Sequence, residues 1–198
     1  MRRTFNLAGI AYLLAGAGAV FAQTAPQPWR PLAETAHFET GDSWLVENTR
    51  YRLYGVQACL RGTTFTNASG QKRDCGEAGL AMLVGLVRDL KPMCTPVLES
   101  AHAGPVLVTC LAFPKTGKAA GSRIDVGTAL IASGFAFAAL KPDGKPVHLP
   151  YFVAELDAKR AKSGLWAFPD LPEPNAIIFK AIRDQQARSG NSPVGVRP

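Results

Sequence analysis

The stretch Tyr51-Arg52-Leu53-Tyr54-Gly55-Val56-Gln57-Ala58-Cys59-Leu60 gives the first indication of the fold. Its first half is predicted to lie in a strand over about 50–56. Two short strands are expected before it, around 36–38 and 43–47. A polar loop rich in Thr, Asn, Ser and Gly follows it over 62–74. The sequence therefore predicts a small β-sheet built around this stretch.

The sequence after this loop alternates between predicted helix and predicted hairpin. A helix is expected from Cys75 to about Leu90, because apolar residues recur at helical spacing and Pro92 ends the pattern. A hairpin is expected next. Its first strand covers about 93–98, and its second covers 106–110 and continues to Phe113, with the turn at 100–104.

Three more helices are expected in the last third of the chain. Asp125 is predicted to cap a helix over about 126–133, and Gly134 to close it. Further helices are expected over about 151–162 and 175–188. Five short strands with helices between and after them predict an α+β fold, mainly β: a five-stranded barrel of the oligonucleotide-binding type (OB-fold) with three helices plus a C-terminal helix.

The N-terminus has the pattern of a secretory signal peptide. Basic residues at positions 2 and 3 precede an apolar run over 7–21, and Val20-Phe21-Ala22 forms a small-residue cleavage site. The run is short for a membrane span, although an uncleaved anchor is the alternative. Cleavage after residue 22 lowers the formal net charge from +7 to +5. We therefore expect a periplasmic or secreted protein with a modestly basic surface, which attracts polyanions.

The predicted domain boundaries follow from composition. After the signal peptide, 1–22, residues 23–35 contain three prolines and are expected to be a linker. The folded domain is expected over 36–168. Residues 169–198 are expected to hold a Pro-rich spacer, the C-terminal helix and a tail disordered from residue 189 onward.

Four cysteines in an exported chain are expected to form disulfides. Three pairings are possible. The predicted hairpin has its midpoint near His102, which places Cys94 opposite Cys110, and facing strand positions have the short Cα separation that a disulfide needs. We therefore favour Cys94–Cys110, with Cys59–Cys75 bracketing the polar loop. A zinc site is disfavoured because no Cys-x-x-Cys pair is present.

Four short motifs resemble the staphylococcal nuclease (thermonuclease) family. That family has G-D-T, R-L-x-G-I-D-A-P-E, D-V-G and G-L-W in this order. The similarity covers roughly residues 38–168, and it implies an OB-fold barrel of the staphylococcal nuclease type. The matching segments are Gly41-Asp42-Ser43, Arg52-Leu53-Tyr54-Gly55-Val56-Gln57-Ala58-Cys59-Leu60, Asp125-Val126-Gly127 and Gly164-Leu165-Trp166.

The resemblance also implies a catalytic site, and this chain keeps only part of it. The family holds Ca²⁺ with two Asp carboxylates and a carbonyl, as suits a hard cation. Asp42 matches the first Asp and Ala58 the carbonyl, but Gln57 stands in place of the second Asp. Leu60 replaces the Glu that handles water. Arg52 matches the first phosphate-binding arginine.

The second phosphate-binding arginine of the family is absent, because the matching segment 103–108 contains none. The leading hypothesis is therefore a non-catalytic binding or accessory protein for nucleic acid, acidic polysaccharide or a protein partner. Such a protein needs no cofactor. The expected binding residues are Arg52, Arg61, Lys72 and Arg73.

The alternative is a calcium-dependent phosphodiesterase with a rearranged site, in which Asp42 and Gln57 would hold Ca²⁺. Arg52 would stabilise the phosphate, and Glu77 would be the replacement base. Glu77 also has a simpler interpretation, as a favourable charge at a helix N-terminus. A third hypothesis is a structural envelope protein that docks a partner protein through its C-terminal helix.

Overall fold

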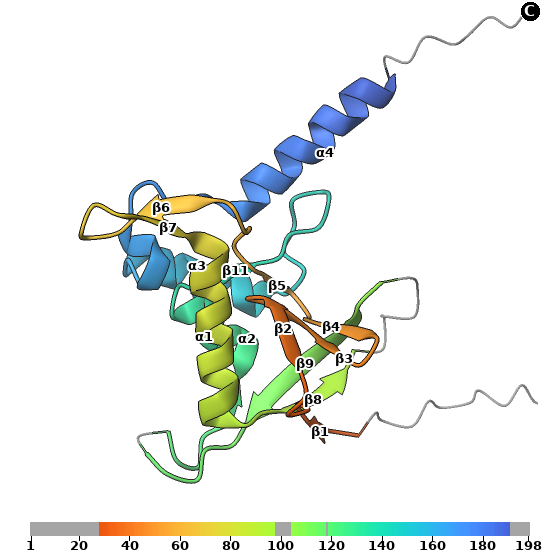
Figure 1. Ribbon diagram of the computed structural model, residues 1–198, viewed down its shortest axis with the longest axis vertical. Helices are drawn as coiled ribbons and strands as arrows, with labels where there is room; N and C mark the ends of the chain where they lie inside the picture. The colour runs from red at the N-terminus through yellow and green to blue at the C-terminus, as the bar shows by residue number, and fades with distance from the viewer. Residues whose placement is uncertain (1–27, 98–103, 118, 191–198) are drawn as a thin grey trace, which may run out of the picture.

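The computed structural model describes residues 28–97, 104–117 and 119–190. The predicted signal peptide, the tip of the cysteine hairpin and the last eight residues lie outside this part. The fold is α+β, with eleven short strands, four α-helices and one 3₁₀ helix in the described residues (Figure 1). The strands are β1 Arg30–Pro31, β2 His37–Thr40, β3 Ser43–Val46, β4 Thr49–Leu53, β5 Val56–Gln57, β6 Thr64–Thr66, β7 Lys72–Asp74, β8 Met93–Pro96, β9 Val106–Ala112, β10 Ile124–Asp125 and β11 Phe137–Ala138. The helices are α1 Cys75–Leu90, α2 Val126–Ala132, α3 Leu149–Arg160, the 3₁₀ helix η1 Gly164–Ala167 and α4 Pro174–Gly190.

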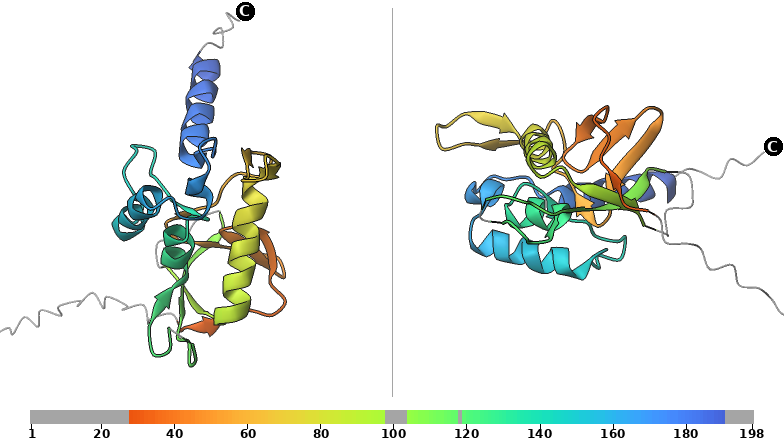
Figure 2. Two further views of the ribbon diagram at one scale, coloured as in Figure 1. Left: turned by 90° about the vertical axis from the view of Figure 1, so that its left-hand side faces the viewer. Right: turned by 90° about the horizontal axis from the view of Figure 1, so that it is seen from below.

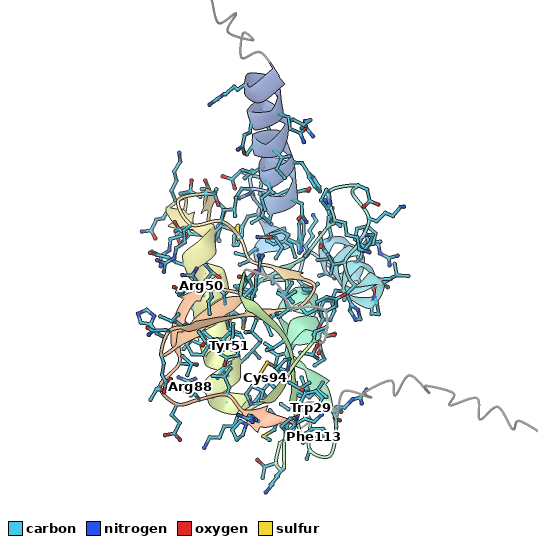
Figure 3. The ribbon with its side chains drawn as sticks, turned by 90° about the vertical axis from the view of Figure 1, so that its right-hand side faces the viewer. Trp29, Arg50, Tyr51, Arg88, Cys94 and Phe113 are labelled. Carbon is cyan, nitrogen blue, oxygen red and sulfur yellow. A yellow bond between two sulfur atoms is a disulfide. The ribbon has the colours of Figure 1, made fainter. Side chains whose placement is uncertain are left out.

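The principal sheet has seven strands and curls into a half-barrel. Its order is β1-β8-β9-β4-β3-β2, with β10 paired to the far end of β9. All neighbours are antiparallel except β4 and β9, which run parallel with Tyr51 opposite Val106. The curl is consistent with an OB-like fold (Figure 1). Tyr51 and Cys94 line an apolar cavity of about 340 Å³ inside the half-barrel. Figure 3 labels both residues on the same side of the molecule.

The described residues contain more β-strands than the sequence predicted. The predicted linker contains β1, which pairs with β8, and the Leu32 N–H donates to the Pro92 carbonyl at 3.1 Å. The predicted polar loop contains the β6–β7 hairpin. The expectation of five strands is therefore too low, because strands of two or three residues carry too little pattern to be read from sequence.

Local sequence explains where the first two helices begin and end. Asp74 accepts a hydrogen bond from the Glu77 N–H at 2.9 Å and caps α1, and Lys91 closes α1 in the left-handed conformation, with φ 45°. Asp125 caps α2 by accepting from the Thr128 N–H at 2.7 Å, as the sequence predicted. The last two helices start earlier than predicted, at Leu149 and Pro174, and α4 continues through residues 189 and 190.

The main core lies between the concave face of the sheet and helices α1, α2 and α3. Trp44, Leu53, Leu83 and Leu130 are buried in it. Close approach matters at Gly41, in the β2–β3 turn. A Cβ there would lie 2.8 Å from the Gly79 carbonyl carbon, so only glycine lets this turn pack against α1. That contact fixes the position of Asp42, the next residue along the chain.

The D-V-G and G-L-W segments are explained by packing. The Tyr151 hydroxyl donates to the Asp125 carboxylate at 2.7 Å, and its ring fills the space where a Cβ on Gly127 would lie. Leu165 is buried in a second core cluster beside Phe137 and the Cys59–Cys75 pair. Phe137 and Tyr151 are therefore core residues.

Both preferred disulfides are present. Cys59 pairs with Cys75 and Cys94 with Cys110, and no cysteine in the described residues is free. The sheet register places Cys94 directly opposite Cys110, as the hairpin argument required. The first bridge ties the segment after β5 to the first residue of α1.

Helix α4 leaves the body of the protein after its first turns (Figures 1 and 2). Its start is anchored, because Pro174 is fully buried and the Asn175 amide donates to the Ala138 carbonyl at 2.9 Å. Residues 180–188 are all exposed. Within the described part of the chain, no helix is both long and apolar enough to cross a bilayer.

Removing either disulfide should destabilise the folded state. Each bridge closes a loop with a sequence separation of 16. Such a loop contributes about 3 kcal/mol by restricting the unfolded chain. We expect Cys59→Ala/Cys75→Ala to lower the free energy of unfolding by about that amount in urea titrations, with a similar loss for the other pair. Peptide mapping that links Cys59 to Cys94 or Cys110 would contradict the assigned pairing.

The Glu155 carboxylate should make stability depend on pH. Burial raises the pKa of Glu155 above its ordinary value, and the nearby Glu173 adds to the shift, although the Ala138 N–H and Lys159 oppose it. Folding therefore strengthens proton binding, so this contribution to stability is complete below the unfolded pKa of about 4.3 and is lost as pH rises through the raised pKa.

The Glu155→Gln variant isolates this contribution, because the other titrating groups are unchanged. Its melting temperature relative to the unmodified protein should rise between pH 4 and pH 7. A difference that stays constant over this range would show that Glu155 has the same pKa in the folded and unfolded chain.

Candidate functional site

Two of the four sequence motifs, those that contain Asp42 and Arg52, meet at one cleft at the edge of the half-barrel. It has a volume of about 530 Å³ and is lined by the β2–β3 turn, strand β4 and the segment that follows β5. Of the residues proposed from sequence, it contains Asp42, Arg52, Gln57 and Arg61. The same cleft also contains Ala58 and Leu60, so the structure brings most of the predicted site together.

Asp42 lies at the bottom of the cleft with its carboxylate saturated by hydrogen bonds. The residue is 3% exposed. Its Oδ1 accepts from the Thr40 hydroxyl at 2.5 Å. Its Oδ2 accepts from the Arg52 Nε at 2.9 Å and from the Ala58 N–H at 3.1 Å, and lies 2.8 Å from Arg52 Nη2. A buried carboxylate needs such partners, because losing water without replacement is costly.

Arg52 and Gln57 extend this network across the mouth of the cleft. Arg52 Nη2, the same atom that lies near Asp42, donates to Gln57 Oε1 at 2.9 Å. Gln57 in turn donates from Nε2 to the Ala58 carbonyl at 2.9 Å. The network Asp42–Arg52–Gln57–Ala58 is therefore closed, because the Ala58 N–H donates back to Asp42 Oδ2.

This arrangement does not fit a calcium ion. Calcium prefers six to eight oxygen ligands, several of them anionic. Here the network offers one carboxylate, already neutralised by Arg52, and the two neutral oxygens of Gln57 and Ala58 already accept hydrogen bonds. Within the described residues no three His, Cys, Asp or Glu side chains are grouped to share a metal. We therefore derive no catalytic step that passes through Ca²⁺.

The cleft also offers a poor general base. Leu60 lines it at the position that the resemblance assigns to the catalytic Glu. Pro105 lines it from the segment where the family has its second arginine, and proline offers no donor. Among the described residues, Glu39 supplies the one carboxylate besides Asp42 that lines the cleft. The hydrogen bond from Arg50 lowers the pKa of Glu39, which weakens it as a base.

The structure separates the other predicted site residues from this cleft. Lys72, Arg73 and Glu77 line a different cavity of about 700 Å³, between the β6–β7 hairpin, the start of α1 and η1. Lys72 and Arg73, which were expected to bind with Arg52 and Arg61, therefore line this second cavity together with Phe135 and Phe168 and do not line the cleft. Glu77 likewise faces that cavity, so it is not placed to act as a base beside Asp42.

Arg50 also lines the cleft, but it was not among the residues predicted from the sequence. Its guanidinium binds both oxygens of Glu39, at 2.6 and 3.0 Å. Figure 3 labels Arg50 above Tyr51, on the side from which α4 rises. The signal was present in the sequence: side chains alternate across a strand, so Arg50 must share a face with Arg52.

Arg61 stands at the rim of the cleft and is held there by its backbone. It follows the disulfide-bonded Cys59 by two residues, and its N atom would lie 2.7 Å from a Cβ on Gly76 in the first turn of α1. Its side chain is exposed, and no acid lies within salt-bridge distance of it among the described residues. The Arg61 guanidinium can therefore meet a ligand, although the Asp74 carboxylate lies near enough to attract it.

No family model matches the chain, and no curated protein matches it. The similarity to thermonucleases therefore rests on the four motifs and their order in the sequence.

The closed network around the buried Asp42 should add more to the free energy of unfolding than an exposed ion pair does. Replacing Asp42 by Ala leaves the Ala58 N–H and part of the Arg52 guanidinium without partners. We expect a loss of about 2–3 kcal/mol in the free energy of unfolding, because Arg52 is half-exposed and regains some water. Glu39→Gln, which breaks the exposed pair with Arg50, is the matched control and should cost less than about 1 kcal/mol. Equal losses in urea titrations would contradict a special role for the Asp42 network.

Proposed function

We propose that this protein is an exported, catalytically degenerate relative of the thermonucleases, with an OB-fold barrel of the staphylococcal nuclease type. In this proposal it acts in the periplasm or outside the cell as a binding or accessory protein. Its cleft, lined by Arg50, Arg52 and Arg61, binds a polyanion such as single-stranded nucleic acid or an acidic polysaccharide.

The closed Asp42–Arg52–Gln57–Ala58 network carries this proposal. A nuclease of this type needs a carboxylate pair free for a metal and a base free for water. Here the one matching carboxylate is neutralised by Arg52, and Gln57 holds the carbonyl that would be the third ligand. Losing the general base costs about 100–10,000-fold in rate, and losing one donor to the developing charge costs about 100–1,000-fold.

The positive charges of the cleft support anion binding. Among the described residues, three arginines and two acids line it, and both acids are paired with an arginine. Arg61 forms no salt bridge there and interacts with Asp74 only at longer range, and the planar guanidinium groups suit phosphate or carboxylate oxygens. The two disulfides and the absence of a membrane-spanning helix in the described residues support export.

The alternative phosphodiesterase is less well supported, because Glu77 faces the second cavity and Glu39 is paired with Arg50. A protein partner docked on α4 is the other alternative, supported by the exposure of residues 180–188.

One experiment tests the proposal and both alternatives. Fluorescence polarisation of a labelled single-stranded oligonucleotide is measured at low salt, with Ca²⁺ or with a chelator, and each sample is then run on a gel. We expect micromolar or weaker binding that falls as salt rises, since counterion release drives such contacts. We expect no cleavage in either sample. An acidic polysaccharide such as polygalacturonate should compete for the same site.

Matched variants locate the binding site. Arg61→Ala should weaken binding several-fold with little change in stability, because Arg61 forms no salt bridge among the described residues and Asp74 interacts with it only at longer range. Lys180→Ala/Arg183→Ala, on the distant α4, should leave binding unchanged. Cleavage that requires Ca²⁺ and disappears in Asp42→Ala would establish the phosphodiesterase instead. If neither polyanion binds, the proposed polyanion ligand is ruled out, and a protein partner becomes the leading candidate ligand.

A further inference from the structure

Helix α3 carries apolar side chains on the face that points away from the protein. Leu149, Val153 and Leu156 are 64%, 50% and 45% exposed. Their spacing of i, i+4 and i+7 places all three on one stripe of the helix. The opposite face is the packed one, where Tyr151 and Ala158 are buried. An ordinary surface helix presents polar residues to water, so core packing does not explain this stripe.

The stripe lies on the outer rim of the molecule. In the view from below in Figure 2, α3 runs lengthwise along one edge, with α2 between it and α1. The contacts of α3 are with α2, β11 and η1, on its inner side. The stripe is therefore a convex ridge. Three side chains on a ridge offer far less area than the roughly 800 Å² per partner that a stable protein interface buries.

Basic residues surround the ridge. Residues 141–162 contain five Lys or Arg and three Asp or Glu. The inward-facing Glu155 accepts a hydrogen bond from the Ala138 N–H at 2.5 Å and does not face the ridge. Lys162 lies two residues after the end of α3, and Lys141 lies in the loop before the helix, where its N–H donates to the Lys145 carbonyl. No acid lies within salt-bridge distance of either lysine in the described part of the chain. The outward charge near the ridge is therefore positive.

We infer that the α3 ridge, formed by Leu149, Val153 and Leu156, docks on an anionic lipid surface, with Lys162 after the helix and Lys141 in the preceding loop as its basic residues. A helix with an apolar stripe and flanking basic residues lies in the plane of the interface, with the stripe among the acyl chains and the ammonium groups at the headgroups. Lipid adapts to a convex ridge, and anionic headgroups attract each nearby Lys or Arg. The inference is independent of the polyanion cleft, which lies elsewhere on the protein.

Vesicle sedimentation tests this inference. The chain from Gln23 onward is used, because the apolar run over 7–21 would bind lipid itself and every described element lies after residue 28. Vesicles are made of phosphatidylcholine alone or mixed with an equal amount of phosphatidylglycerol. We expect association with the anionic vesicles to exceed that with the neutral ones at least about tenfold, and to fall as salt rises.

Variants assign the effect to the ridge. Leu149→Gln/Leu156→Gln changes two exposed side chains, so the protein should remain folded by circular dichroism. This variant should lose at least about tenfold of its association with anionic vesicles, because the apolar contact is removed. Phe113→Ser is the matched control: Phe113 is 59% exposed but lies at the lower end of the molecule in Figure 3, and its loss should change nothing. Arg61→Ala should also have no effect.

Three outcomes would overturn the inference. The first is equal association with neutral and anionic vesicles. The second is unchanged association in the Leu149→Gln/Leu156→Gln variant. The third is a dimer in sedimentation velocity that the same variant abolishes, since that would assign the ridge to a contact between two copies of this chain.

Discussion

The burial of the Asp42 carboxylate is the constraint on which the cleft depends. A charge this far from water must be matched by an opposite charge and by hydrogen-bond donors. The structure supplies both from three separate segments: Thr40 from the end of β2, Arg52 from β4, and the Ala58 N–H from the segment after β5. One carboxylate thus holds together the three pieces of backbone that form the cleft. Gly41 makes this possible, because the turn that carries Asp42 can pack directly on α1.

The same constraint links the proposed loss of catalysis to the form of the cleft. In the family that the motifs resemble, a second Asp and a metal ion share the charge of the first Asp. Here Gln57 carries no charge, so a metal would be held by one carboxylate. Arg52 supplies the positive charge instead, and Gln57 Oε1 helps to orient the guanidinium by accepting a hydrogen bond from Nη2. The carbonyl of Ala58 is then occupied by the Gln57 amide. Replacing one Asp by Gln therefore changes the role of the neighbouring arginine from binding phosphate alone to neutralising Asp42 as well.

The sequence predicted the parts of the fold whose determinants are local. The start of α1 at Asp74 and of α2 at Asp125 could be predicted because a capping side chain binds a backbone N–H three residues later. The Cys94–Cys110 bridge could be predicted because a hairpin fixes which residues face each other. Strand β1 could not be predicted, since two residues in a proline-rich segment become a strand only where β8 offers an unpaired edge.

The composition of the cleft was predictable to the extent that the motifs carry it. Asp42, Arg52 and Gln57 were expected together because their motifs resemble one site, whereas the places of Lys72 and Arg73 depend on how a loop folds. That loop becomes a hairpin held by Asp170, which accepts from the Thr66 N–H and hydroxyl across more than a hundred residues of sequence. A contact at that separation leaves no local pattern. Charge near a motif in sequence is therefore weak grounds for placing a residue in a site, and Arg50 shows the converse, since the alternation of β4 alone was sufficient to place it there.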